Sequence, residues 1–291
     1  MEMVTKRLVA RQIASVYDPL GWIVPLPTQA KSFQRNLWKQ QFQWDTEIPP
    51  ELRNQWSDII GLINGFQKSF PRRVCASFGT QNLAVFADAR EIAIAACAYP
   101  FNEKTSALVM AKGKLPSVKT ITTMPKLELN ALTLATLLAN SISEVLKTHS
   151  HIVLNWLSAP RRSHLGVLVE KRGREIRRIV ENLEEKRVTV LFSYVNTNEN
   201  PADAGTRGLA KEGLSDYFWW TGPKFLKTPI GTWSTKFNQL AHVNDTTFDD
   251  VSNGECLNIS VASTAFTESA SVHELLNWTR YSSFPEKQLQ H

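Results

Sequence analysis

Three acidic residues occupy positions from which carboxylates can do chemistry together. Asp88 ends a short apolar run, Glu128 lies just inside a long helical pattern, and Asp203 sits in a loop between Pro201 and Gly205. Carboxylate oxygens are the hard ligands that Mg²⁺ and Mn²⁺ prefer. Two such ions about 4 Å apart can activate water and stabilise the leaving oxygen of a phosphodiester. If folding brings the three acids together, we expect a divalent-metal site there.

Each acid also has an ordinary structural explanation. Glu128 could interact with the dipole at the start of its helix, and Asp203 could close an Asx-turn. Asp88 could be an exposed strand end. Spacing alone does not choose between these alternatives, so the choice depends on the elements that carry the three residues.

The first part of the chain has helical patterns. Apolar residues recur at helical spacing over residues 5–17, again from Thr28, and again after Pro50. Thr28 is the predicted N-cap of the second helix, and Pro50 suits the first turn of the third. We therefore predict a small helical unit over residues 1–72. The side chains expected to pack its helices together are Trp22, Phe33, Leu37 and Trp56.

From residue 73 the pattern changes to strands followed by long helices. Three β-rich runs, which predict a hairpin meander, cover Leu83–Ala89, Ile92–Phe101 and Ser106–Leu115. Helices are predicted over Met124–Thr148 and Gly166–Glu185, and a further strand over Val188–Val195. The fold class is thus α/β, with a mixed sheet flanked by helices over residues 73–215. The polar segment 216–291 predicts a loose tail with a short helix near Val272–Thr279.

Composition narrows the class of protein. The chain has 291 residues, of which 43% are apolar, and a formal net charge of +6, which favours an anionic partner such as nucleic acid. Its three cysteines lack the short spacing of a disulfide framework or a zinc site. There is no secretion signal and no apolar run long enough to cross a bilayer. We expect a soluble protein of the cytoplasm or nucleus with no membrane partner.

Several motifs occur in an order that resembles a known family. They are VFADAR, MPKLELNALTLA, HIVLNWL, GVLVEKRGREIRRI, NENPADAGTRGL and FWWTGPKFL. Together they resemble the ribonuclease H-like segment of the pol polyprotein of Bel/Pao-type LTR retrotransposons, a region sometimes classed as a Pao retrotransposon peptidase. The segment ARQIASVYDPLGWIVPLPTQAKSFQRNLW resembles the part that follows the reverse transcriptase, and HELLNWTRYSSF resembles the linker before the integrase.

The resemblance implies a fold, an activity and a set of ligands. The fold is a ribonuclease H-like mixed sheet, and the activity is cleavage of RNA in RNA–DNA hybrids with Mg²⁺ or Mn²⁺. Asp88, Glu128 and Asp203 match three of the four acids that bind the metals and catalyse the reaction in that family. The implied partners are an RNA–DNA hybrid or other nucleic acid, and the other pol domains of the parent element.

The fourth acid of the family is missing from this sequence. His149 stands in its place, and a neutral imidazole is a poor ligand for Mg²⁺. The strand that should lead into this position also has no room after the long helix, so we expect one sheet strand to be missing. Three alternatives stay open. HIVLNWL could become a replacement strand, the long helix could end early, or the sheet could remain imperfect.

Basic and aromatic residues could contact nucleic acid. Arg174, Arg177 and Arg178 lie off the apolar stripe of the second long helix, where they either track phosphates or simply solvate the helix. The tryptophans that could stack on bases or belong to the core are Trp156, Trp219 and Trp220.

We therefore expect a ribonuclease H-like nuclease with an impaired metal site. The alternative is a catalytically inactive, nucleic-acid-binding relic. An aspartic peptidase is disfavoured, because the Asp-Ala-Gly-Thr at residues 203–206 is a poor match to its motif.

Overall fold

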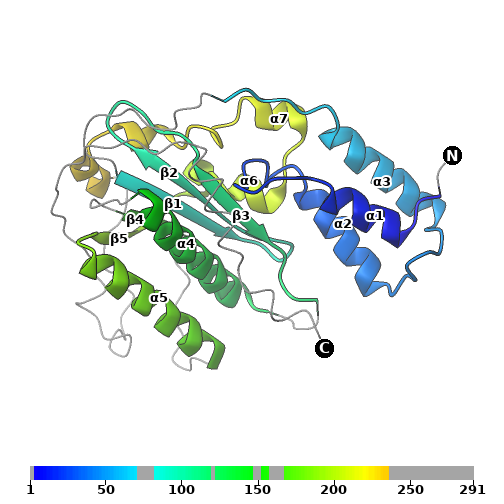
Figure 1. Cartoon of the computed structure of the whole chain (residues 1–291), viewed down its shortest axis with the longest axis horizontal. Coiled ribbons are helices and arrows are strands. Elements are labelled where there is room, and N and C mark those ends of the chain that lie inside the picture. The colour runs from blue at the N-terminus through cyan, green and yellow to red at the C-terminus, as the bar shows by residue number, and fades with distance from the viewer. Residues whose placement is uncertain (1–2, 71–81, 119–121, 147–151, 157–166, 236–291) are drawn as a thin grey trace.

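The structure, a computed structural model, describes residues 3–70, 82–118, 122–146, 152–156 and 167–235. In these parts of the chain a group of three helices lies beside a sheet that is flanked by further helices (Figure 1). None of the described helices is both long and apolar enough to span a membrane.

The amino-terminal helices form one small unit. They are α1 (Lys6–Ala14), α2 (Thr28–Lys39) and α3 (Pro50–Ile63). The hydroxyl of Thr5 caps α1 by accepting a hydrogen bond of 3.2 Å from the backbone N–H of Leu8. The apolar faces of the helices share a buried cluster, made of Val9, Ala30, Phe33, Leu37, Ile48, Trp56 and Ile59. The unit therefore has a core of its own.

Two predicted roles in this unit are wrong, because both side chains attach the unit to the rest of the protein. Thr28 is the first residue of α2, and the N-cap is Pro27. The hydroxyl of Thr28 donates a hydrogen bond of 2.9 Å to the carbonyl of Gly205. Trp22 lies outside the helical cluster, and its indole N–H donates to the carbonyl of Val109 at 2.9 Å. Both bonds join residues that are distant in sequence, so only the folded chain could reveal them.

The sheet has five strands in the order β3-β2-β1-β4-β5. Its strands are β1 (Asn82–Ala89), β2 (Ile94–Phe101), β3 (Met110–Lys114), β4 (Ile152–Trp156) and β5 (Val190–Tyr194). The first three form the predicted antiparallel meander, whereas β4 and β5 are parallel to β1. Three antiparallel strands followed by two that are parallel to the first make a ribonuclease H-like mixed sheet. The predicted fold class is confirmed.

The expectation that one sheet strand is missing is wrong. Residues Ile152–Trp156, from the HIVLNWL motif, form β4 and pair with both β1 and β5. An empty place between β1 and β5 would leave the backbone groups of two strands without partners, and this cost favours a strand over a helix for an apolar run. The first of the three alternatives is therefore the one that the structure adopts.

The sheet separates two layers of core. α4 (Met124–Leu146) and α5 (Val167–Glu185) cover one face (Figure 1), where they meet the odd-numbered residues of β1 such as Val85 and Ala87. The even-numbered residues Ala84 and Phe86 belong to the second core layer, with α6 (Ala202–Arg207) and the segment after it. The alternation follows from the period of two along a strand. It makes β1 a strand that is buried on both faces.

The segment between α1 and α2 lies against β3. The backbone N–H of Ala111 donates to the carbonyl of Leu20 at 2.8 Å. Gly21 has φ +73°, and a Cβ atom built there would lie 1.8 Å from the carbonyl oxygen of Ala111. Only glycine tolerates both the backbone conformation and the close approach. The residues after α1 thus form an integral part of the sheet domain.

The packed core also extends past the predicted start of a loose tail at residue 216. Five side chains of residues 216–235 are buried in the second core layer: Trp219, Trp220, Phe225, Leu226 and Trp233. The tryptophans among them are core residues, and Trp219 and Trp220 are not available to stack on bases. The helix predicted near Val272–Thr279 lies outside the described residues.

Candidate active site

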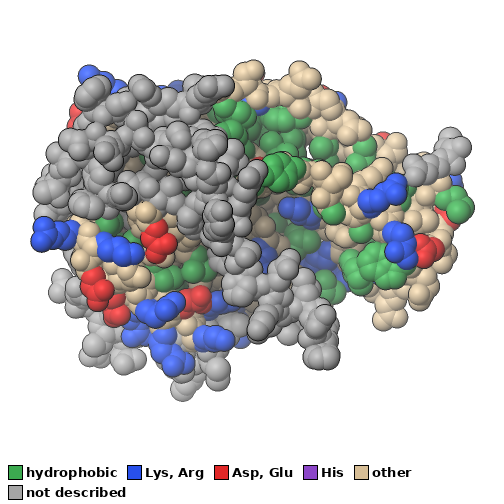
Figure 2. All heavy atoms as spheres, viewed as in Figure 1, with side chains coloured by type: hydrophobic (Ala, Val, Ile, Leu, Met, Phe, Trp, Pro, Cys, Tyr) green, Lys and Arg blue, Asp and Glu red, His purple; other side chains and the backbone are tan. Residues whose placement is uncertain are grey.

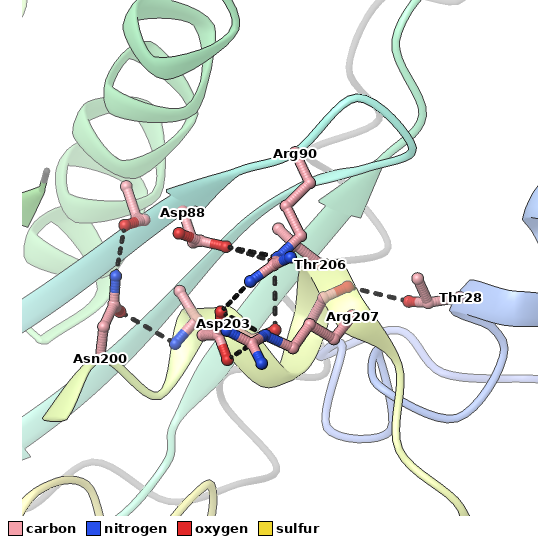
Figure 3. A network of polar contacts seen from close by, with 10 residues as sticks. Thr28, Asp88, Arg90, Asn200, Asp203, Thr206 and Arg207 are labelled. Atoms are coloured by element: carbon pink, nitrogen blue, oxygen red, sulfur yellow. Dashed lines mark hydrogen bonds and ion pairs between the residues drawn. The ribbon is translucent and has the colours of Figure 1, made fainter. Parts of the chain in front are cut away.

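Asp88 lies next to the last residue of β1 and is almost completely buried. Its side chain is only 3% exposed. The hydroxyl of Thr206, on α6, donates a hydrogen bond to a carboxylate oxygen of Asp88 (Figure 3). A buried carboxylate requires such a donor, because it has lost its hydration. The unusual acid in an apolar strand is therefore held by a partner from the opposite end of the domain sequence.

Asp203 lies in the first turn of α6, and its side chain is 10% exposed. Two arginines contact it. Nε of Arg207, one helical turn later, lies 2.8 Å from its carboxylate oxygens, and Nη2 of Arg90 lies 2.9 Å from Oδ1. Because these hydrogen bonds join opposite charges, they are stronger than neutral ones. Asp203 is thus fixed from both sides.

Arg90 joins Asp88 and Asp203. Its Nη2 donates to Asp203, and its Nε lies 4.0 Å from Oδ2 of Asp88. Figure 3 shows the guanidinium of Arg90 between the two acids. The structure therefore brings these two acids to the same place, although β1 and α6 are far apart in sequence.

Asn200 connects the backbones that carry the two acids. Its side-chain amide donates to the carbonyl of Ala87 at 2.8 Å, and its side-chain oxygen accepts from the N–H of Ala202 at 3.1 Å. Asn200 is fully buried. Ala87 precedes Asp88, and Ala202 precedes Asp203, so one side chain sets the position of both acids.

Glu128 approaches from α4, on the other core layer. It is half buried, and its Oε2 is buried without a hydrogen-bond partner among the described residues. Burial raises the pKa of Glu128, and the negative charge of Asp88 raises it further. Glu128 therefore lies close enough to Asp88 for the two carboxylates to repel each other.

The pKa of Asp88 is also raised. Burial is the largest cause, and the charge of Asp203 adds to it. The hydrogen bond from Thr206 and the charge of Arg90 act in the opposite direction. Burial and a neighbouring carboxylate thus disfavour the charged form of Asp88, and a cation beside it would favour that form.

The carboxylates suit a hard divalent ion, but their arrangement is not that of a complete metal site. The unpartnered oxygen of Glu128 is an available ligand, and Asp88 and Asp203 supply carboxylates of the type that Mg²⁺ and Mn²⁺ prefer. Within the described ranges, however, no group of three or more His, Cys, Asp and Glu residues could hold a metal ion as it stands. Arg90 already provides positive charge between two of the acids. The chemistry of the residues present therefore fits a hard divalent ion.

The other predicted site residues that the structure describes are not part of this acidic cluster. Arg174, Arg177 and Arg178 are on α5, which packs against α4; Arg174 and Arg178 are exposed, and Arg177 is partly buried. Figure 2 shows Lys and Arg mixed with Asp and Glu at the lower left, where Figure 1 places α5. This surface is therefore mixed in charge. His149 lies outside the described residues.

Sequence reasoning missed four residues of this network: Arg90, Asn200, Thr206 and Arg207. A motif signal was present for all four, because Asn200, Thr206 and Arg207 flank Asp203 in NENPADAGTRGL and Arg90 ends the motif VFADAR. Arg90 lies only two residues after Asp88, but its pairing with Asp203 spans 113 residues and is invisible to local patterns.

A model of the Pao retrotransposon-like RNaseH-like domain family matches residues 5–158, which is more than half of the chain. No curated protein matches. Among solved structures, RuvC of Thermus thermophilus is similar at 10% identity and a TM-score of 0.24, over 38% of this chain and 63% of that protein.

Two further structures are similar. The NurA nuclease of Sulfolobus solfataricus is 11% identical with a TM-score of 0.28, over 62% of this chain and 66% of that chain. A foamy viral protease-reverse transcriptase in complex with dsDNA is 12% identical with a TM-score of 0.32, over 65% of this chain and 41% of that chain. The chain spans less than two thirds of each of these three proteins.

Proposed function

Since the chain belongs to the Pao retrotransposon-like RNaseH-like domain family, we propose that it is a nuclease domain that slowly cleaves the RNA strand of RNA–DNA hybrids with Mg²⁺ or Mn²⁺. In this proposal it is a fragment of a Bel/Pao-type pol polyprotein, and its partners are the hybrid and the other pol domains. It would act in the cytoplasm or the nucleus, where such hybrids are made.

The observation that carries this proposal is the meeting of Asp88 and Asp203 at one guanidinium, with the carboxyl of Glu128 close enough to sense Asp88. Asp88 on β1 and Asp203 in the first turn of α6 share Arg90, and the negative charge of Asp88 acts on Glu128 of α4. Neighbouring carboxylates disfavour one another's charged forms, and a bound cation relieves that repulsion.

The residues divide the work as follows. Asp88, Glu128 and Asp203 would hold the metal ions, which supply an activated water and stabilise the leaving oxygen. Thr206 orients Asp88 through its hydroxyl, and Asn200 sets the spacing between β1 and α6. Arg174, Arg177 and Arg178 would contact the phosphates of the bound nucleic acid.

Low turnover is expected for two reasons. β4 (Ile152–Trp156) carries no acid, so it contributes no fourth carboxylate. Arg90 forms ion pairs with two of the three acids that are present, Asp88 and Asp203. In-line displacement with two ions depends on a full set of ligands.

A second candidate is nucleic-acid binding without catalysis. It is favoured by the same ion pairs, together with the lack of a ready-made metal cluster among the described residues. In that case the acids and Arg90 would be a structural network, and the chain would keep only the binding surface of its family.

The test uses the purified chain and an RNA–DNA hybrid with a labelled RNA strand. We expect slow cleavage of the RNA with Mn²⁺ or Mg²⁺, reduced at least about a hundredfold by Asp88→Asn. Asp58→Asn, which neutralises an exposed acid on α3, is the matched control and should leave cleavage unchanged. Binding of the hybrid without any Asp88-dependent cleavage would favour the second candidate. If the chain neither binds nor cleaves the hybrid, both candidate functions are ruled out.

A further inference from the structure

Arg90 has a backbone position that fixes where its side chain can reach. It follows β1 directly, and its N–H donates to the carbonyl of Ala93 at 2.8 Å across the turn to β2. The next residue, Glu91, is held from outside, because its carbonyl accepts a hydrogen bond of 3.1 Å from Arg35 on α2. The turn therefore holds the start of the Arg90 side chain beside the acidic end of β1.

The guanidinium of Arg90 is well placed by charge but only partly satisfied by hydrogen bonds. Nη2 makes one bond of 2.9 Å to Asp203. Nε is buried, has no hydrogen-bond partner among the described residues, and lies 4.0 Å from Asp88, which is too far for a hydrogen bond. The side chain is still 39% exposed, so it has a route to solvent. These contacts are those of a cation that can leave.

We propose that Arg90 is a built-in cation that neutralises Asp88 and Asp203 in the metal-free protein and competes with divalent ions for them. This inference rests on the proposed role of the two acids as metal ligands. An ion between the acids would meet the guanidinium at short range, and like charges repel strongly there. Arg90 must therefore swing out before an ion binds, and the affinity for the ion falls by the cost of that movement.

Arg207 does not have the same role. Its Nε contacts Asp203 alone, from the next turn of α6, and its side chain is 51% exposed. It supports one carboxylate from the rim, whereas Arg90 lies between two. Removing Arg90 should therefore change ion binding more than removing any singly paired arginine.

The experiment measures Mn²⁺ affinity by titration, with free Mn²⁺ followed by electron paramagnetic resonance. Arg90→Ser should bind Mn²⁺ about tenfold more tightly than the wild type, since one positive charge at short range has gone. Arg90→Gln, which keeps a donor without the charge, is the second variant in case Arg90→Ser does not fold. Arg7→Gln removes a paired guanidinium from the helical unit and controls for net charge.

A thermal readout follows the same idea without any nuclease assay. Arg90→Ser should melt at a lower temperature than the wild type without metal, and Mn²⁺ should raise its melting temperature more than that of the wild type. Adding Asp88→Asn should remove the extra rise. If the wild type binds Mn²⁺ and Arg90→Ser binds it equally, the inference is wrong and the proposed function stands. If no variant binds Mn²⁺ through Asp88, both are wrong.

Discussion

The side-chain amide of Asn200 donates a hydrogen bond of 2.8 Å to the carbonyl of Ala87, the residue before Asp88. The same side chain accepts from the N–H of Ala202, the residue before Asp203 (Figure 3). One buried amide therefore positions the backbones of both acids. The spacing between β1 and α6 depends on this residue as much as on the acids themselves.

Asn200→Ala should lower the free energy of unfolding by about 2–3 kcal/mol, because it leaves a buried carbonyl and a buried N–H without partners. Urea denaturation measures this loss. Asn198→Ala, an exposed neighbour, should have little effect. Equal stability of the two variants would show that Asn200 does not hold β1 and α6 together.

Thr206→Val should also destabilise the protein, by about 1–3 kcal/mol, since it removes the donor to the buried carboxylate of Asp88. The same change should raise the pKa of Asp88 further, because the hydrogen bond from Thr206 lowers it. Thr206→Ser keeps the hydroxyl and should restore most of the stability. Carbon-detected NMR of the Asp88 carboxyl follows the pKa. A fall of that pKa in Thr206→Val would contradict the assigned bond.

Stability should depend on pH through Asp88 and Glu128. Both have a pKa that is raised in the folded protein, with burial as the largest cause. The folded state therefore binds more protons than the unfolded state between the ordinary carboxyl pKa and the raised values. The free energy of unfolding must fall as pH rises through that window.

The measurement compares variants, because other carboxyls titrate in the same range. The double variant Asp88→Asn/Glu128→Gln should lose less stability than the wild type as pH rises from about 4 through the raised pKa values. Thermal denaturation without divalent ions, over a series of pH values, detects the difference. Parallel curves for the two proteins would show that these acids carry no such penalty.

His149→Asp should not raise cleavage. β4 begins at Ile152, so His149 precedes the strand in the chain. β4 is parallel to β1, and its carboxyl end at Trp156 therefore lies toward the end of β1 that carries Asp88. Asn155 of β4 pairs in register with Phe86, two residues before Asp88, and Asn155→Asp is the change expected to increase Mn²⁺-dependent cleavage of the hybrid. Asp88→Asn in the same chain should abolish the gain. An increase with His149→Asp instead would show that the family's fourth site is reached by a different path.

The sequence by itself determined the elements whose signals are local. The apolar stripe of α4 and the β-rich runs of β1 and β2 predicted those elements close to their observed bounds, because helical and strand periodicities depend on neighbouring residues. The order of the motifs predicted the fold class. The sequence also showed Asp88 to be an unusual residue, because it is an acid within an otherwise apolar strand pattern.

Only the tertiary structure decided the features that depend on distant partners. The run Ile152–Trp156 is short and apolar, so it is ambiguous between helix and strand until β1 and β5 offer backbone groups on both sides. The pairing of Arg90 with Asp203 likewise joins two charges that are 113 residues apart. Neither outcome is encoded in a local pattern, because each depends on the energy of groups that meet only when the chain has folded.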